Sequence, residues 1–326
     1  MSGKAGLMAI DWTSVQSFPE CIPCVFKQVL NTVRLVTDNE DTQRELLLDA
    51  MKVVQRADFT RAAAEISYHA LIRACNALGC LDPYREAKRH YNDMVLGSLD
   101  ELRAMIAAAP DPLHTAAKMA VAGNIIDMGI RGNSFDVRET VNHALERGLA
   151  IDHFDRLRRK LDAATTVLYI LDNAGEVVFD RLLIERLAGK RVCCVVRKSP
   201  ILNDVTRLEA SEVGLADMCE VIDTGCDVFG VPMDLVSDAF RRRFHAADVV
   251  ISKGQANYET LDTVDRPVFF ILMAKCERVA RTLGVGLREA VLMESGGKND
   301  GRTGEREDRK TGGKDEPEHR TVNSEQ

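Results

Sequence analysis

Thr166-Val-Leu-Tyr-Ile-Leu-Asp-Asn-Ala-Gly-Glu176 is the segment around which the rest of the chain is organised. Its apolar residues 167–171 are rich in strand-forming types and predict a strand buried on both faces. Asp172 and Asn173 follow at once, and Gly175 leads into a helical pattern. Ligands of open α/β sheets bind outside the carboxyl ends of the strands, so these two polar side chains stand where chemistry is usual.

The residue types in this turn suit a metal ion and a phosphate. A carboxylate and an amide oxygen side by side are ligands that a hard cation prefers. Gly175 and the helix start behind it offer backbone N–H groups to an anion. The alternative is an ordinary strand-to-helix turn, in which Asp172 or Asn173 only caps the helix. Polar clusters at other predicted strand ends favour the functional interpretation.

Composition describes a globular protein with room for two domains. The 326 residues are 45% hydrophobic and carry a formal charge of −7, which argues against general nucleic-acid binding. No apolar run reaches membrane-spanning length, and the first twenty residues lack a signal-peptide pattern, so we expect a cytoplasmic protein without a membrane partner. The nine cysteines are expected to stay free of structural disulfides. Oligomeric state is not accessible from these patterns.

Four regions are predicted along the chain. Residues 1–18 form a flexible lead-in, and residues 19–163 read as a helical domain. Residues 164–293 alternate strand and helix, which predicts an α/β fold: a Rossmann-like α/β/α domain with a mainly parallel sheet of about five strands. Residues 294–326 carry almost no apolar side chain and are predicted to be a disordered polar tail.

Charged and amide side chains follow the other predicted strands at 191–196, 220–222, 249–252 and 268–272. Arg197 follows the first of these; Asn203 is then placed to cap the next helix, with Asp204 in its first turn. Lys253 and Asn257 follow the strand at 249–252. The alternative for Lys253 is a solvated lysine at a strand end.

Two further features stand in the helical region. Asn124 and Asp127 interrupt an otherwise apolar helix and are three residues apart, so they share one face. They either satisfy each other and nearby backbone or reach into a cleft. Cys21 and Cys24 form a C-x-x-C at a helix start, which is compatible with half of a metal site, a redox pair or two inert thiols.

The motifs Asp172-Asn-Ala-Gly-Glu176, Arg197-x-x-Pro-Ile-x-Asn-Asp-Val-Thr206 and Lys253-Gly-Gln-x-Asn-Tyr-Glu259 together resemble a known family. They are similar to the metal-dependent damage-control phosphatases, formerly domain-of-unknown-function family 89. The resemblance is to the short prokaryotic subgroup, which also carries an N-terminal C-x-x-C, and it spans roughly residues 20–293.

This resemblance implies a helical domain packed on a Rossmann-like domain, with a divalent cation (Mg, Mn, Co or Ni) held by Asp172, Asn173 and Asp204. It implies that Lys253 binds the substrate phosphate and that Asn124 and Asp127 face the cleft. With the strand-end positions, it assigns substrate contacts to Asn124, Asp127, Gly175, Glu176, Arg197, Asn203, Lys253 and Asn257. Two departures from the family pattern are Ala256, where Gly is usual, and Glu209, where Asp is usual.

The expected activity is metal-dependent hydrolysis of small phosphorylated metabolites, such as sugar phosphates or related damaged or surplus compounds. The cation would polarise a phosphoryl oxygen and orient a water, although direct attack by Asp172 is an alternative. One rival function is carboxyl methyl transfer, an activity also attributed to a relative of the family, but the first turn has no G-x-G-like loop. The other rival is a non-catalytic phosphometabolite-binding protein.

Overall fold

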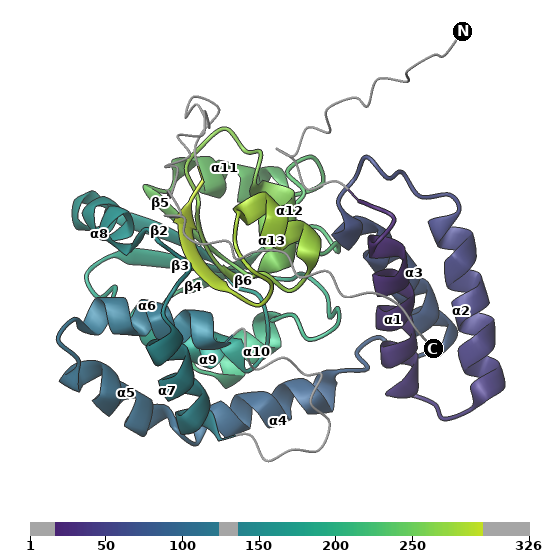
Figure 1. The fold of residues 1–326 in the computed structure, drawn as a ribbon, viewed down its shortest axis with the longest axis horizontal. Helices are drawn as coiled ribbons and strands as arrows, with labels where there is room; N and C mark the ends of the chain where they lie inside the picture. The colour runs from purple at the N-terminus through teal and green to yellow at the C-terminus, as the bar shows by residue number, and fades with distance from the viewer. Residues whose placement is uncertain (1–16, 124–135, 296–326) are drawn as a thin grey trace, which may run out of the picture.

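A seven-stranded sheet forms the centre of the protein in the computed structural model, which describes residues 17–123 and 136–295 (Figure 1). The strands are β1 (Ile151–Asp152), β2 (Thr166–Ile170), β3 (Arg191–Val196), β4 (Glu220–Asp223), β5 (Val249–Lys253), β6 (Phe269–Met273) and β7 (Ala290–Glu294). Their order is β1-β7-β6-β5-β2-β3-β4. Neighbours are parallel except β6 and β7, which run antiparallel.

This sheet confirms the predicted α/β class and its mainly parallel strands. β2 lies between β3 and β5, and its residues 167–170 are buried, as expected for a central strand flanked by crossover helices. The edge strand β1 and the antiparallel β7 were not predicted. β1 has only two residues, too few for a periodic signal, and β7 ends where the polar tail was expected to begin.

Thirteen helices are present in the described residues. They are α1 (Cys21–Arg34), α2 (Glu40–Val54), α3 (Ala63–Ala77), α4 (Arg85–Leu96), α5 (Leu99–Ala108), α6 (Pro112–Ala122), α7 (Val137–Arg147), α8 (Phe154–Ala163), α9 (Glu176–Glu185), α10 (Arg207–Glu212), α11 (Asp238–Ala246), α12 (Gln255–Leu261) and α13 (Glu277–Leu283). None of these helices has the length and apolar character to cross a membrane.

Side-chain alternation along the strands divides the core into two layers. Val167 and Tyr169 of β2 point to one face, where they share a core with α4–α10, while Leu168 and Ile170 point to the other, packed by α11–α13. In the view of Figure 1, α6 and α9 lie below the strands and α11 lies above them. The sheet is therefore covered by helices on both faces.

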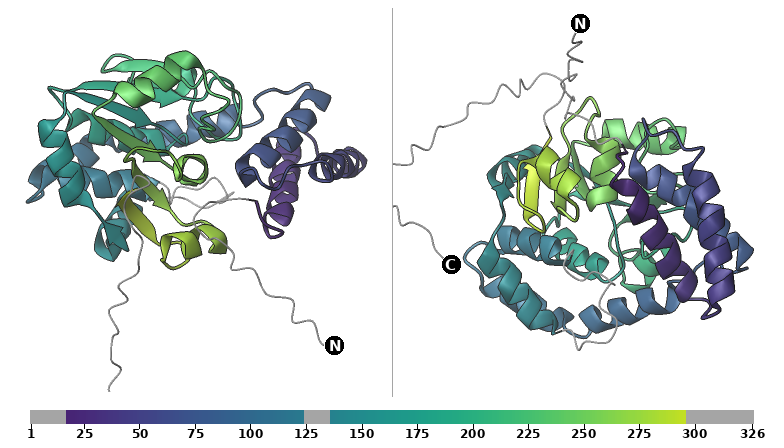
Figure 2. Two further views of the ribbon diagram at one scale, coloured as in Figure 1. Left: turned by 90° about the horizontal axis from the view of Figure 1, so that it is seen from above. Right: turned by 45° about the vertical axis from the view of Figure 1, so that its right-hand side comes forward.

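Helices α1–α3 form a separate bundle with a core of its own, which stands beside the sheet (Figure 2). Ile201 and Phe229, from the loops that follow β3 and β4, are part of this core. The bundle thus packs against the loops at the carboxyl ends of the strands. The helices predicted for residues 19–163 fall into two packing groups, α1–α3 on the loops and α4–α8 on the sheet.

Candidate active site

The loops that follow β2 and β3 are tied together by backbone hydrogen bonds. The Val205 N–H donates to the Asp172 carbonyl at 2.9 Å, and the Ala174 N–H donates to the Asn203 carbonyl at 2.8 Å. Asn173 and Asp204 form an isolated β-bridge between the loops. The side chains of Asp172 and Asp204 are almost wholly enclosed, with the residues 6% and 4% exposed. The structure therefore brings together the three residues predicted to hold a metal.

Gly254, at the end of β5, makes room for the Asp172 carboxylate. Its φ is +79°, and a Cβ at this position would lie 2.0 Å from Asp172 Oδ2. Only glycine meets both conditions, because other residues disfavour a positive φ and would collide with the carboxylate. On its other side, Asp172 Oδ2 accepts a hydrogen bond of 2.6 Å from Asn173 Nδ2.

Arg197 and Asn257 hold Asp204 in place. Arg197 Nε donates to Asp204 Oδ2 at 2.6 Å, and its Nη2 donates to Asn257 Oδ1 at 2.7 Å. The Asn257 amide donates to the carbonyls of Lys253 and Leu171. Both side chains are buried, and these partners occupy their polar groups. Arg197 and Asn257 thus position Asp204 and the strand ends, and their contact with a substrate stays a prediction.

Lys253 lies in a buried ionic network behind the site. It is 0% exposed, and its Nζ donates to Glu176 Oε1 at 2.6 Å, Asp180 Oδ1 at 2.5 Å and the Ala120 carbonyl at 2.8 Å. The Tyr169 hydroxyl also donates to Asp180, at 2.7 Å. An ammonium group has three donors, and all three are used. In this arrangement Lys253 has no donor left for the substrate phosphate that it was predicted to bind. Glu176, a predicted substrate contact, forms an internal ion pair with it.

Gly175 and Asn203 also differ from expectation. The Gly175 N–H donates to Asn92 Oδ1 at 2.7 Å, so the amide predicted to face an anion already has a partner. Helix α10 is capped by Thr206, in a capping box with Glu209, because the chain turns later than the Asn203 signal suggested. Asp204 accordingly lies before the helix. Glu209 also pairs with the buried Lys88, at 2.7 Å.

Burial and mutual repulsion make the acidic pair electrostatically unfavourable. Burial raises the pKa of Asp172 well above 3.8, and the neighbouring Asp204 and Glu176 carboxylates raise it further. Burial also raises the pKa of Asp204, although the Arg197 guanidinium partly offsets this. A carboxylate kept from ionising by negative neighbours is stabilised by a nearby cation. The site therefore favours a positively charged ligand.

Lys275 also belongs to this site, although no sequence motif pointed to it. It follows β6, is exposed, and its ammonium partly offsets the raised pKa values of both Asp172 and Asp204. Its backbone N–H donates to Gln255 Oε1 at 2.9 Å. The available signal was its position directly after a predicted strand. Asp180 was also missed, although it lies four residues after Glu176 and so on the same helical face.

Asn124 and Asp127 lie outside the described residues, so their predicted place in the cleft is not tested. The last described residue before them, Gly123, packs closely on Glu176. A Cβ at Gly123 would lie 2.9 Å from Glu176 Cγ. Gly123 therefore lies against the first residue of α9, Glu176, which is one of the acidic partners of Lys253.

Cys21 and Cys24 occupy the first turn of α1. The Phe18 N–H donates to Cys21 Sγ at 3.5 Å. Burial raises the pKa of both thiols, and Glu259 and Cys276 add to the effect. Cys276 is therefore a third thiol within electrostatic reach of both. Raised pKa values favour protonated thiols over reactive thiolates.

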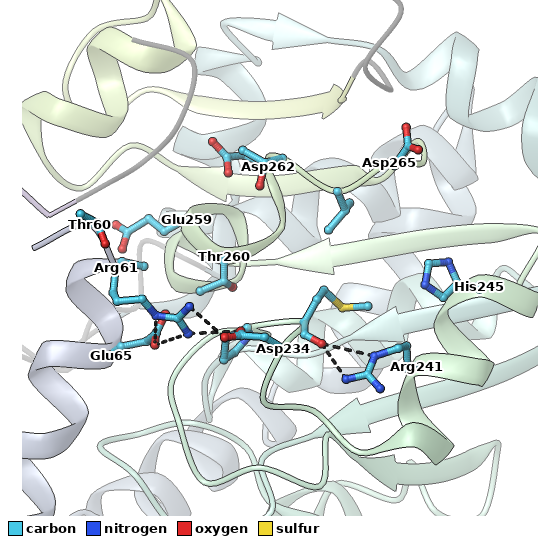
Figure 3. A pocket seen from close by; sticks show the side chains of 15 residues that line it. Thr60, Arg61, Glu65, Asp234, Arg241, His245, Glu259, Thr260, Asp262 and Asp265 are labelled. Carbon is cyan, nitrogen blue, oxygen red and sulfur yellow. Dashed lines mark hydrogen bonds and ion pairs between the residues drawn. The ribbon is translucent and has the colours of Figure 1, made fainter. Parts of the chain in front are cut away.

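A hollow of about 560 Å³ lies at the junction of the α1–α3 bundle and the sheet domain (Figure 3). Arg61, which lines it, pairs with Glu65 and with Asp234 across the junction, each at 2.8 Å. None of the residues predicted to bind metal or phosphate lines this hollow. The hollow lies between the α1–α3 bundle and the sheet domain and shares no residue with the acidic site.

The donor set of the acidic site fits a hard divalent cation. Within the described ranges, no three or more His, Cys, Asp and Glu side chains are gathered in a metal-holding group, so the set rests on two carboxylates and the Asn173 amide. All three supply oxygen, the ligand that Mg²⁺ and Mn²⁺ prefer. The Asn173 amide would have to turn, because its Nδ2 faces Asp172 here.

Fold and site together define an α/β protein with an acidic, cation-favouring site at the carboxyl ends of its strands. A family model described as "Damage-control phosphatase ARMT1-like domain" matches residues 17–291. The chain therefore belongs to this family, which confirms the family resemblance; the subgroup's N-terminal C-x-x-C is not tested by the match.

Curated relatives and a solved structure agree with this assignment. The chain is 33% identical over 296 residues to "Uncharacterized protein MJ0202" of Methanocaldococcus jannaschii, covering 86% of this chain and 96% of that protein. It is 33% identical over 281 residues to "Damage-control phosphatase PH1575" of Pyrococcus horikoshii, covering 85% and 97%. The crystal structure of PH1575, described as a DUF89 family protein, superposes with a TM-score of 0.79 at 32% identity, covering 86% of this chain and 99% of that one.

Proposed function

We propose that this chain is a divalent-metal-dependent phosphatase that hydrolyses small phosphorylated metabolites, such as sugar phosphates or related damaged or surplus compounds. Two curated relatives, from Pyrococcus horikoshii and Archaeoglobus fulgidus, are named damage-control phosphatases. The observation that carries the proposal is the buried pair of Asp172 and Asp204 at the carboxyl ends of β2 and β3. Their raised pKa values favour a bound cation.

In this proposal Asp172, Asp204 and Asn173 hold the metal. When bound, a divalent cation polarises a phosphoryl oxygen and lowers the pKa of a water molecule. Arg197 fixes the orientation of Asp204 through its Nε donor. Gly254 leaves space for the Asp172 carboxylate, so the ligand pair is held in place before the substrate arrives.

Lys275 is the proposed phosphate-binding group, in place of Lys253. It is exposed at the end of β6 and lies within electrostatic reach of both acidic ligands. A lysine ammonium binds a phosphate as a point charge. A substrate phosphate between the metal and Lys275 would therefore meet positive charge on two sides.

Lys275→Ala is expected to lower kcat/KM for a phosphate ester by about 10- to 100-fold, mainly through KM, because a hydrogen bond to a charged group contributes about 1.5–3 kcal/mol. The thermal unfolding midpoint should stay close to that of the unmodified chain, since the side chain is exposed. Steady-state kinetics and a thermal melt on the same samples measure both.

Lys198→Ala is the matched control, since Lys198 is likewise an exposed lysine that follows a strand; its ammonium pairs with Asp227 at 3.1 Å. Its kinetics should be unchanged. Equal KM increases in the two variants would indicate a general surface-charge effect and would remove the specific role of Lys275.

The proposed activity is tested by phosphate release from sugar phosphates and p-nitrophenyl phosphate, with protein stripped of metal and then supplied with Mg²⁺, Mn²⁺, Co²⁺ or Ni²⁺. We expect release only after a metal is added. A folded protein that releases no phosphate with any metal would contradict the proposal and favour a phosphometabolite-binding function. Phosphate release that is equally fast in metal-free protein would show a phosphatase that does not depend on a metal.

A further inference from the structure

Cys194 and Cys219 form a close pair of thiols that takes no part in the proposed metal site. Their Sγ atoms are 3.2 Å apart, in hydrogen-bonding contact, although the residues are 25 positions apart in the chain. A disulfide bond is about 2.05 Å long, so a closure of roughly 1.2 Å would join them. Both are free thiols in this structure.

The sheet register explains why these two cysteines meet and Cys193 does not join them. Cys193 pairs with Glu220 in the β3–β4 ladder, and alternate residues of a strand point to opposite faces. Cys194 therefore faces the core covered by α9 and α10, and Cys219, just before Glu220, packs against that same core. Cys193 faces the opposite core. The pair is fixed by strand geometry rather than by a mobile surface.

The two thiols differ in access and in acidity. Cys194 is fully enclosed in the sheet, whereas Cys219 is half-buried and reachable from solvent. The hydrogen bond with Cys194 lowers the pKa of Cys219, against the effect of burial. The same contact and burial raise the pKa of Cys194. Reactive thiols in proteins combine exposure with a lowered pKa, so the asymmetry assigns Cys219 the first step.

We propose that Cys219 and Cys194 form a thiol–disulfide exchange site, in which Cys219 reacts with a small-molecule disulfide and Cys194 resolves the product. Cys219 thiolate attacks one sulfur of RSSR, the S–S bond breaks, and RS⁻ leaves and takes up a proton. Cys194 then loses its proton and attacks Cys219 Sγ, releasing the second RS⁻ as RSH. Two cysteine thiols are oxidised to one disulfide while RSSR is reduced to two RSH.

The test is to treat the folded full chain with oxidised glutathione, block remaining thiols and map peptides without reduction. Trypsin cuts at arginines that place the two cysteines on separate peptides, residues 192–197 and 208–241, and cleavage after Glu220 separates Cys219 from Cys226. Peptide 192–197 holds both Cys193 and Cys194, so fragment ions that carry the blocking group on Cys193 assign the bond. We expect a Cys194–Cys219 cross-linked peptide lighter by two hydrogens, with no glutathione retained on Cys219. The cross-linked chain should also unfold at a higher temperature than the reduced chain, because the bond closes a long loop.

Variants separate the two steps. Cys194→Ala should accumulate glutathione on Cys219, because the resolving thiol is gone, while Cys219→Ala should leave the enclosed Cys194 unmodified. Cys193→Ala, the neighbour on the opposite face, should cross-link as the unmodified chain does. A chain that retains glutathione on Cys219 without cross-linking, or whose Cys219 never reacts, overturns the proposal. The unmodified chain alone decides this, so a variant that fails to fold does not remove the test.

Discussion

Asp172→Asn is expected to abolish metal-dependent phosphate release and, at the same time, to raise the thermal unfolding midpoint of the metal-free protein. The loss should reach about 10³-fold in kcat/KM, the upper range for removing one preorganised electrostatic group. An amide keeps the shape of the carboxylate and the space left by Gly254, but it supplies no charge to hold a cation.

The gain in stability follows from the sign of the pKa shift. The pKa of Asp172 is raised above its ordinary value of 3.8 by burial, Asp204 and Glu176. The folded state therefore binds the proton more tightly than the unfolded state, and stability falls as the pH rises above 3.8. At neutral pH the unfolded carboxyl group is ionised, and moving it into this buried acidic site costs folding free energy; a neutral amide avoids that cost.

Asp204→Asn provides a contrasting comparison. We expect the same loss of activity but a loss of stability, because the buried Arg197 guanidinium, 2.6 Å from Asp204, would be left without its anionic partner. Asp217→Asn, on an exposed loop residue, should change neither property. Melts of metal-free protein and phosphate-release assays with added metal give both readouts.

Two outcomes would sink this account. Metal-dependent release that survives Asp172→Asn would remove Asp172 from the metal site. An Asp172→Asn chain that melts below the unmodified one would mean that the carboxylate contributes net stability through its contacts, and the site would then not favour a cation.

Strong local signals predict the sheet and the position of Asp172 and Asn173 at a strand end, whereas the grouping of Asp204 with them was implied by the family resemblance. A buried apolar run followed by polar residues identifies each central strand and its end, and parallel strands bring those ends to one edge. Edge elements lack such signals: β1 has two residues and shows no period. Sequence motifs therefore predict where the site lies better than they predict the orientation of its side chains.

The orientation of individual polar side chains is what sequence could not supply. Lys253 and Lys275 both come after predicted strands, yet the Lys253 ammonium is enclosed by Glu176 and Asp180 whereas Lys275 is an exposed residue. The difference arises from α9, whose acidic residues four apart face β5, a tertiary contact with no local signature. The same applies to Arg197, whose partners Gly230 and Asn257 are 33 and 60 residues away in the chain.

Lys253→Met is expected to destabilise the protein by about 3–5 kcal/mol at neutral pH, the usual cost of removing one partner from a buried ion pair. Methionine fills similar space but leaves Glu176 and Asp180 without their shared cation. Denaturant unfolding of the metal-free protein measures the change. Lys160→Met, an exposed lysine on α8, is the control and should have almost no effect.

The pH dependence of this deficit separates charge from packing. Burial raises the pKa of Asp180 to about 6, even though Lys253 lowers it, so removing Lys253 moves that pKa higher still. The folded variant therefore takes up a proton as the pH falls, while the unfolded carboxyl group, with its ordinary pKa of 3.8, stays ionised until lower pH. Stability lost at pH 8 should be partly regained near pH 5, and Asp180→Asn in the same chain should recover part of it at pH 8. A loss of stability that does not depend on pH would indicate lost packing. Unchanged stability with a raised KM would indicate that Lys253, and not Lys275, binds the substrate phosphate.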